Sequence, residues 1–242
     1  MAISPSGIIG SLRVLGAMAR VTGPTLVDLA RDHLERSTVD KRARWFGRRV
    51  IDVLDVRLTA TGSDRVPAGR AYVYMSNHQS HLDIPMLYAT LPSPTIRMLG
   101  KKELFEIPLW GRGLRAAEFI EVDRSNHDAA MKSIDRAAEL VRQGVSFYLA
   151  PEGTRSRDGS IGKLKKGGFH LAVGTGAPIV PVAIAGTIKI LPRGSKLMRT
   201  GVPVQVTIGA PIPVEGRDIE GLMAEVRDFL VKNVESGKGA PT

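Results

Sequence analysis

Short apolar runs alternate with helical segments along most of the chain, and this alternation constrains the fold more than any other feature. Strands that alternate with helices predict an α/β layered fold, in which helices flank a central, mostly parallel or mixed sheet. The expected strands are residues 56–61, 71–75, 95–99, 117–122, 145–150, 179–185 and 202–208. The expected helices are residues 82–91, 126–142, 167–173 and 218–235.

The chain divides into three expected parts. Residues 1–55 form an N-terminal amphipathic helical segment, residues 56–235 form the α/β domain, and residues 236–242 form a disordered tail. A chain of 242 residues is long enough for one such domain with a sizeable core. In the first part, Gly23 and Pro24 interrupt the apolar pattern, which predicts two helices with a kink between them.

A second amphipathic helix is expected over residues 41–54, where Trp45 and Phe46 lie among several arginines. A helix that lies in an anionic membrane interface has this composition. The alternative is that its apolar stripe packs on the protein's own core. Residues 8–21 are interrupted by Arg13 and Arg20 and fall short of the ~20 apolar residues of a span, and we expect no cleavable signal peptide of the usual form.

The charge of the chain predicts an anionic partner. Its formal net charge is +10 and its pI about 10.1, which suits nucleic acid, acidic lipid or a phosphorylated substrate. The aromatic content of 5% is low for a protein that stacks on bases, so we expect no nucleic-acid partner. The chain has no cysteine, which excludes disulfides and thiolate chemistry and suits a reducing compartment.

The motif Asn-His-Gln-Ser-His-Leu-Asp at residues 77–83 joins one expected strand to the next helix. On a continuous helix His78 and Asp83 would lie roughly 140° apart. If His78 lies in the turn and Asp83 in the first helical turn, the carboxylate can orient the imidazole as a general base. The alternatives are a loop histidine with a capping aspartate, or a metal site of His78, His81 and Asp83, for which the chain supplies no second ligand cluster.

A second polar block begins just after the strand expected at residues 145–150. Gly153 allows close backbone approach, Thr154 offers a hydroxyl, and Arg155 offers a planar fork that suits phosphate. Arg124 also follows a strand, so the two guanidinium groups could converge on one phosphate at the edge of the sheet. The alternative is that both arginines form surface ion pairs, Arg155 with Glu152 or Asp158 and Arg124 with Asp123.

Four blocks in this order resemble the four conserved blocks of the glycerolipid acyltransferases, most closely the 1-acylglycerol-3-phosphate acyltransferases. The resemblance covers about residues 55–210, and Ala150 departs from it where the family often has phenylalanine. The blocks are residues 77–83, Phe-Ile-Glu-Val-Asp-Arg at 119–124, Pro-Glu-Gly-Thr-Arg-Ser at 151–156 and Ala-Pro-Ile-Val-Pro-Val at 177–182.

The resemblance implies an enzyme of phospholipid biosynthesis that docks by its N-terminal helices, as a peripheral or monotopic protein, on the cytoplasmic face of the cell membrane. It would transfer a fatty acyl group from acyl-CoA or acyl-carrier protein to the free hydroxyl of 1-acylglycerol 3-phosphate, giving phosphatidic acid. A thioester is already activated, so neither a metal nor another cofactor is expected. The chain has no Gly-x-Ser-x-Gly elbow, which favours direct transfer without an acyl-enzyme.

The resemblance also implies roles for individual residues. His78 matches the base and Asp83 its partner. Pro178 and Pro181 match a block associated with shaping the acyl site. The expected phosphate or acceptor ligands are Arg124, Glu152, Gly153, Thr154 and Arg155, and weaker contacts to the donor or to anionic lipid are expected from Lys101, Lys163, Lys165 and Lys166.

Other functions remain open at the level of sequence. The acceptor could be glycerol 3-phosphate, another lysophospholipid or a glycolipid. With water as acceptor, the protein would be a hydrolase of thioesters or lipid esters. A basic lipid-binding protein without catalysis is the non-enzymatic alternative.

Overall fold

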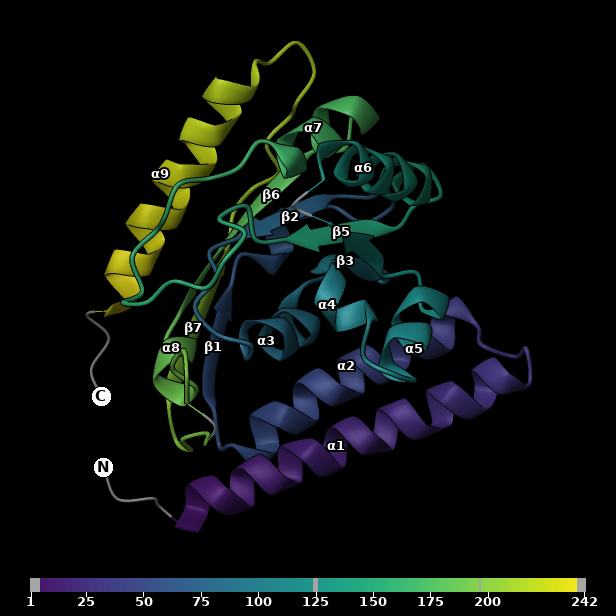
Figure 1. Cartoon of the computed structure of the whole chain (residues 1–242). Coiled ribbons are helices and arrows are strands. Elements are labelled where there is room, and N and C mark those ends of the chain that lie inside the picture. Colours follow the sequence, from purple (N-terminus) through teal and green to yellow (C-terminus); the bar gives the residue numbers. More distant parts are fainter. Residues whose placement is uncertain (1–4, 124–125, 196, 239–242) are drawn as a thin grey trace.

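The centre of the molecule is one seven-stranded sheet (Figure 1). The computed structural model describes residues 5–123, 126–195 and 197–238. The strands are β1 (Arg57–Thr61), β2 (Val73–Ser76), β3 (Ile96–Lys101), β4 (Ile120–Val122), β5 (Ser146–Leu149), β6 (Ile179–Ala185) and β7 (Pro203–Ile208). Their order across the sheet is β1-β7-β6-β2-β5-β3-β4, and only β6 and β7 pair antiparallel. The sheet is therefore mixed and mostly parallel, as the sequence predicts.

Helices cover both faces of the sheet and give the molecule three layers (Figure 1). One face carries α6 (His127–Arg142), α7 (Gly167–Thr175) and α9 (Ile219–Lys238), and the other carries α1 (Pro5–Ala30), α2 (Arg36–Val53) and α3 (Asp83–Thr90). Shorter helices lie in the connections: η1 (Ser63–Arg65), α4 (Lys102–Phe105), α5 (Trp110–Ala116) and α8 (Thr187–Ile190).

The alternation of side chains along each strand divides the core into two clusters. In β2, Val73 and Met75 face the layer of α6, α7 and α9, whereas Tyr74 faces the layer of α1, α2 and α3. Successive side chains of a strand point to opposite faces, so a strand buried on both sides is apolar throughout. Each fully buried aliphatic side chain contributes about 1.5–3 kcal/mol. The central strands therefore hold both helical layers in place.

Local signals set the ends of two helices near the site. The side chain of Asn126 accepts a hydrogen bond from the backbone N–H of Ala129 (3.1 Å) and begins α6 as predicted. Gly144 follows the end of that helix with a φ of 88°. In α3, Pro85 lies in the first turn, where its missing N–H removes no intrahelical hydrogen bond.

The N-terminal segment differs from the predicted pair of kinked helices. The first helix, α1, is one helix of 26 residues that continues through Pro24. On the C-terminal side of the proline, Arg42 of α2 donates hydrogen bonds to Thr25 Oγ1 (3.1 Å) and to the Asp28 carboxylate (2.6 Å). These contacts between helices cannot be read from local sequence. None of the helices in the described residues combines the length and hydrophobicity needed to span a bilayer.

The second helix, α2, belongs to the core on its inner face. Val50 and the following Leu54 are fully buried, so the alternative of packing on the protein's own core is correct for this face. Arg97 of β3 is only 1% exposed and pairs with Asp40 of α2 (2.5 Å) and with Glu118 (3.3 Å). A buried ion-pair network therefore joins α2 to the sheet.

The C-terminal helix is longer than predicted. It runs through Lys238, so residues 236–238 of the expected disordered tail are helical. A glycine inside a helix costs about 1 kcal/mol relative to alanine, and the last turn tolerates this cost at Gly237. Residues 239–242 of the expected tail lie outside the described residues.

Candidate active site

The loops that follow β2, β5 and β6 meet at one edge of the sheet. These strands are mutually parallel neighbours, so their carboxyl ends lie together, where open α/β sheets bind ligands. His78 follows β2, Glu152 follows β5 and Thr187 follows β6. The topology thus brings together residues from three distant parts of the sequence.

His78 and Asp83 are in direct contact, as the sequence predicts for a turn followed by a helix. The His78 Nδ1 atom lies 2.8 Å from Asp83 Oδ2, the Asp83 side chain is fully buried, and the His78 side chain is 20% exposed. Because Nδ1 faces a carboxylate, it carries the proton, and Nε2 is left as the basic nitrogen. None of the described residues forms a hydrogen bond with Nε2. The imidazole can therefore accept a proton from a group outside the protein.

Four hydrogen bonds satisfy the Asp83 carboxylate. Besides His78, the backbone N–H groups of Gln79 (2.8 Å) and Ser80 (3.0 Å) donate to Oδ2. The hydroxyl of Thr187 donates to Oδ1 (2.5 Å). Burying an ionised carboxylate is costly unless hydrogen bonds replace its hydration. Among the described residues no group of three acidic or histidine side chains is arranged to hold a metal ion.

Thr187 is a site residue that the sequence analysis missed. It begins α8 directly after Gly186, whose φ is 104° and where an added Cβ would lie 2.3 Å from the Pro203 carbonyl oxygen. Glycine at this position lets the chain turn sharply at the end of β6 and brings the hydroxyl to Asp83. The available signal was a polar residue just past the end of a buried strand.

Asn77 fixes the position of the His78 loop against β6. Its side-chain Nδ2 donates to the Ile184 carbonyl, and its Oδ1 accepts from the Ile184 N–H, both at 2.8 Å. The asparagine side chain thus pairs with a strand as another backbone would. It extends the contact between β2 and β6 to the residue that precedes His78.

Glu152 connects the His78 loop to the loop after β5. Its side chain is buried, and its two oxygens accept hydrogen bonds from the backbone N–H groups of His78 (2.9 Å) and Gly162 (2.7 Å). A carboxylate in this arrangement positions loops, and its charge would repel a phosphate. The predicted phosphate ligands that remain in this block are Gly153, with a φ of 73°, Thr154 and Arg155.

Arg155 forms neither of the ion pairs considered above. Glu152 is used by backbone donors, and Asp158 accepts hydrogen bonds from Ser160 and Ser156, which lower the pKa of Asp158 to about 2. Within the part of the chain that the structure describes, no carboxylate lies within ion-pair distance of Arg155. Its guanidinium is therefore available to an external anion.

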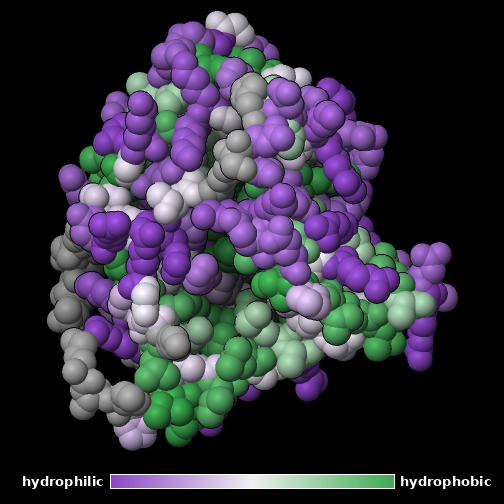
Figure 2. Space-filling model, viewed as in Figure 1, coloured by the Kyte–Doolittle hydropathy of each residue, from purple (hydrophilic) through white to green (hydrophobic). Residues whose placement is uncertain are grey.

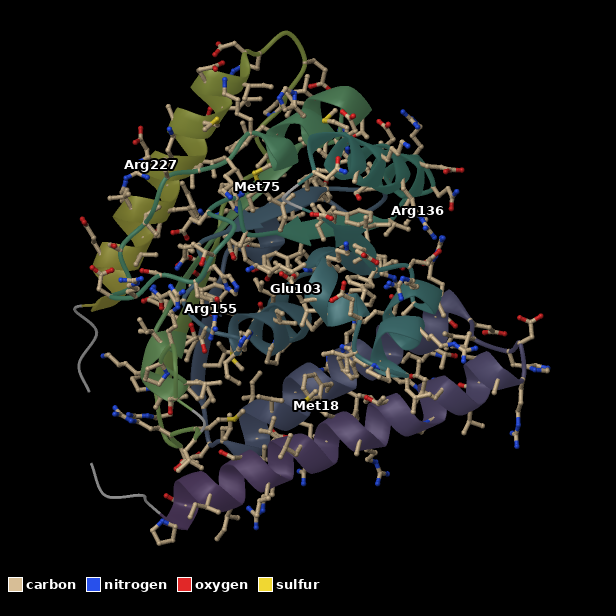
Figure 3. The ribbon with its side chains drawn as sticks, in the orientation of Figure 1. Met18, Met75, Glu103, Arg136, Arg155 and Arg227 are labelled. Carbon is tan, nitrogen blue, oxygen red and sulfur yellow. The ribbon has the colours of Figure 1, made fainter. Side chains whose placement is uncertain are left out.

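Arg155 lies close to the His78 loop, at the edge where the strands end (Figure 3). The N–H of the next residue, Ser156, donates to the His78 carbonyl (2.7 Å). Partial loss of hydration, followed by the positive charge of Arg155 and the neighbouring His78 ring, lowers the pKa of His81. Arg155, His78 and His81 thus share one electropositive region beside the basic nitrogen.

The other predicted site residues are dispersed. Arg124 lies outside the described residues. Lys101 is exposed at the carboxyl end of β3, on the same edge as His78. Lys166 pairs with Glu220 of α9 (2.5 Å), and Lys163 lines a shallow cleft beside the same helix. The backbone N–H of Lys165 donates to the Pro151 carbonyl (2.8 Å).

The structure does not bring Pro178 or Pro181 to this edge. Pro178 precedes β6 at the opposite edge of the sheet, where its carbonyl accepts from the Val73 N–H (3.0 Å). Pro181 faces α9, because an added Cβ on Gly209 would lie 2.8 Å from Pro181 Cγ and 2.9 Å from the ring of Phe229. A role of the two prolines in shaping an acyl site stays a prediction that gains no support from their positions.

A comparison with known protein families matches residues 57–185 to the model described as Acyltransferase, more than half of the chain. The chain belongs to this acyltransferase family. The matched region includes His78, Asp83 and the Glu152–Arg155 block, and it ends two residues before Thr187.

Individual members of the acyltransferase family share its sequence and fold. The chain is 39% identical over 162 residues to a chloroplastic 1-acyl-sn-glycerol-3-phosphate acyltransferase of Brassica napus (67% of this chain, 46% of that protein). It is 32% identical over 180 residues to the alpha enzyme of the same name in Homo sapiens (73% and 63%). The chain spans about half the length of the chloroplastic relatives that it matches.

A solved structure matches nearly the whole fold. The crystal structure of the 1-acyl-sn-glycerophosphate (LPA) acyltransferase PlsC of Thermotoga maritima superposes with a TM-score of 0.84 at 28% sequence identity, covering 98% of both chains. The mixed sheet and its helical layers are therefore shared by the two acyltransferase-family proteins.

Proposed function

We propose that this protein transfers a fatty acyl group from an acyl thioester, acyl-CoA or acyl-carrier protein, to the free hydroxyl of 1-acylglycerol 3-phosphate and so forms phosphatidic acid. The observation that carries this proposal is the pairing of His78 with a buried Asp83, beside Arg155, which has no carboxylate partner among the described residues. The similarity to acyltransferases that act on 1-acyl-sn-glycerol 3-phosphate supports this choice of acceptor.

In the proposed reaction, His78 Nε2 takes the proton of the acceptor hydroxyl as its oxygen attacks the thioester carbonyl. Asp83 stabilises the resulting imidazolium through Nδ1. The tetrahedral intermediate then expels the thiolate, which takes the proton back from Nε2, so that ester and free thiol are formed and His78 is regenerated. A positioned base of this kind contributes about 100- to 10,000-fold in rate.

Arg155 would hold the acceptor phosphate while the hydroxyl reacts. A guanidinium matches the geometry of phosphate oxygens, and the nearby His81 offers a second nitrogen donor. Thr154 precedes Arg155 and adds a hydroxyl, and we retain Arg124 as a further ligand on the basis of its motif. Binding the phosphate fixes the acceptor, and such positioning lowers the barrier further.

Membrane docking through α1 and α2 is part of the proposal. The exposed face of α1 carries Ile8, Leu12 and Leu15, with Arg13 and Arg20 beside them. Apolar side chains fill much of the lower part of the face shown in Figure 2, where α1 runs. This composition suits a helix that rests in an anionic interface. We propose peripheral attachment at the cytoplasmic face of the cell membrane.

Thiol release from long-chain acyl-CoA, measured across several acceptors, tests the proposed function. We expect release with 1-acylglycerol 3-phosphate and little with glycerol 3-phosphate, an uncharged glycolipid or water alone. His78→Ala should abolish release, whereas His170→Ala, a change on the exposed surface of α7, should not. Release without any acceptor would indicate a hydrolase, and the absence of release with every acceptor, from both acyl-CoA and acyl-carrier protein, would indicate a binding protein.

A further inference from the structure

Exposed large apolar side chains are concentrated in one part of the molecule. Among the described residues, they lie on α1, on α2 and on residues 102–109, and outside these segments only Met131 of α6 and Val173 of α7 are exposed to a similar degree. We call the concentrated set the apolar band: Ile8, Ile9, Leu12, Leu15, Val27, Trp45, Leu104, Ile107 and Leu109. Exposed apolar side chains that are concentrated in one region of a protein surface indicate an interaction site.

Residues 102–109, which comprise α4 and the turn to α5, extend the apolar band beyond the N-terminal helices. Leu104, Ile107 and Leu109 are 44%, 47% and 60% exposed. Leu109 also has a φ of 64°, which is unfavourable for a side chain of this kind. Three apolar side chains are thus exposed to water, and one of them lies in an unfavourable backbone conformation.

The segment is nevertheless held in a defined shape. The Gly111 N–H donates to the Ile107 carbonyl (2.8 Å), and the Gly113 N–H donates to the Leu109 carbonyl (3.0 Å). The Arg115 guanidinium donates to the Phe105 carbonyl (3.0 Å) and lies over the Phe105 ring at 5.4 Å. The buried Phe105 anchors the turn, so these contacts hold Leu104, Ile107 and Leu109 in exposed positions.

The position of the segment connects the active-site edge with the N-terminal helices. It begins where β3 ends, and β3 runs parallel to β5, whose following loop carries Arg155. At its other end α5 packs against α1, and an added Cβ on Gly113 would lie 3.8 Å from Leu26 Cδ2. In Figure 1, α4 and α5 lie between the sheet and α1, and Figure 2 shows apolar side chains continuing from α1 across this region.

The charges around the apolar band favour a lipid surface as its occupant. Arg13 and Arg20 flank it on α1, and Lys101 and Arg112 are exposed at the two ends of the 102–109 segment. The acidic Glu103 and Glu106 reduce the local positive charge, so insertion of the segment depends mainly on its apolar side chains. The attraction to anionic lipid comes from α1 and from the net charge of +10.

We propose that residues 104–109 insert into the lipid surface at the mouth of the active site, beside the helices that dock the protein. This inference rests on the proposed function, because the lipid acceptor would pass along this segment on its way from the bilayer to His78. The segment follows Lys101, which lies at the same edge of the sheet as His78, so its insertion would bring lipid to that edge.

Tryptophan fluorescence tests the insertion directly, because the chain has two tryptophans and one of them, Trp110, directly follows Leu109. Trp45→Phe leaves Trp110 as the single reporter and preserves an aromatic ring beneath Arg20. On vesicles of phosphatidylcholine and phosphatidylglycerol, we expect Trp110 emission to shift to shorter wavelength and to be quenched by lipids brominated near the headgroup. Vesicle-bound protein whose Trp110 is not quenched, or protein that does not bind the vesicles, would overturn the inference.

A set of substitutions separates lipid contact from catalysis. We expect the combined Leu104→Ser, Ile107→Ser and Leu109→Asn variant to transfer acyl groups about tenfold more slowly to a long-chain acceptor in vesicles. With a water-soluble short-chain acceptor, its rate should stay within about twofold of wild type, since the buried core is unchanged. Asparagine is chosen at position 109 because it tolerates a positive φ.

The control variant combines Met131→Ser and Val173→Ser, which remove exposed apolar side chains outside the apolar band and should change neither rate. An equal loss on both acceptors would place the segment in the site itself and overturn the inference, as would an unchanged rate on vesicles. If the wild-type protein transfers no acyl group at all, the proposed function fails, and the quenching of Trp110 still decides whether the segment contacts lipid.

Discussion

The hydroxyl of Thr187 donates a hydrogen bond to the buried Oδ1 of Asp83, and neither residue is accessible to solvent. Thr187 comes from the end of β6, whereas Asp83 begins the helix that follows β2. The orientation of the Asp83 carboxylate, and through it that of the His78 ring, therefore depends on two neighbouring strands. Thr187 is a positioning residue, since it acts on the reaction only through Asp83.

Replacing Thr187 tests this relationship. Thr187→Val leaves one carboxylate oxygen of Asp83 without its donor, which should cost about 1–3 kcal/mol in the free energy of unfolding. We expect kcat to fall about tenfold while KM for the acceptor stays near the wild-type value, because the phosphate ligands are unaffected. Thr187→Ser keeps the hydroxyl and should restore most of kcat. A serine variant as impaired as the valine variant would contradict the positioning role.

The proposed base predicts a graded loss of activity. His78→Ala should lower kcat by about 100- to 10,000-fold. Because it also removes a hydrogen-bond donor from the buried Asp83 carboxylate, it should cost about 1–3 kcal/mol in the free energy of unfolding. Asp83→Asn places an amide where Nδ1–H needs an acceptor and should reduce kcat to a similar extent. Steady-state kinetics together with urea unfolding measure both effects. Turnover of His78→Ala near that of wild type would remove the base assignment.

Arg155 is predicted to discriminate acceptors by their phosphate. Arg155→Ala should raise KM for 1-acylglycerol 3-phosphate by about tenfold or more, because a charge-assisted contact to phosphate contributes about 1.5–3 kcal/mol. The weak rate with an unphosphorylated acceptor should be unaffected. Arg157→Ala changes an exposed arginine on the same loop and serves as the matched control. Equal losses on phosphorylated and unphosphorylated acceptors would exclude a phosphate role.

The electropositive cluster predicts a pH effect at His81. Loss of hydration, with the charge of Arg155 and the nearby His78 ring, lowers the pKa of His81 below its ordinary 6.5, so the unfolded chain binds this proton more readily than the folded protein does. The contribution of neutral His81 to the free energy of unfolding is therefore fully present above pH 6.5. It is lost as the pH falls through the pKa of His81 in the folded protein. In Arg155→Ala we expect the pKa to move back towards 6.5. NMR titration of the ring protons measures it, and identical curves for both proteins would refute the cluster.

Local sequence predicted the parts of the site that lie close together in the chain. The contact between His78 and Asp83 spans five residues and follows from a turn that opens a helix. Thr187 is 104 residues from Asp83, and its role requires knowing that β6 lies beside β2. The predicted division into two helices at Pro24 was wrong, since α1 is one continuous helix, and its contacts with Arg42 of α2 come from a different part of the sequence. The periodicity of side chains predicts the helices and strands, whereas the order of the strands in the sheet determines which residues meet in the site.

The placement of Arg97 between Asp40 and Glu118 has a consequence for how the protein can be dissected. Without α2, this guanidinium would remain deep in the protein with one carboxylate fewer, and losing a partner of a buried charge costs about 3–5 kcal/mol. The N-terminal helices are therefore not a removable anchor. Any truncation that deletes them also removes part of the protein's own interior, so the proposed lipid contact is better tested by changing the outward side chains of α1 than by shortening the polypeptide.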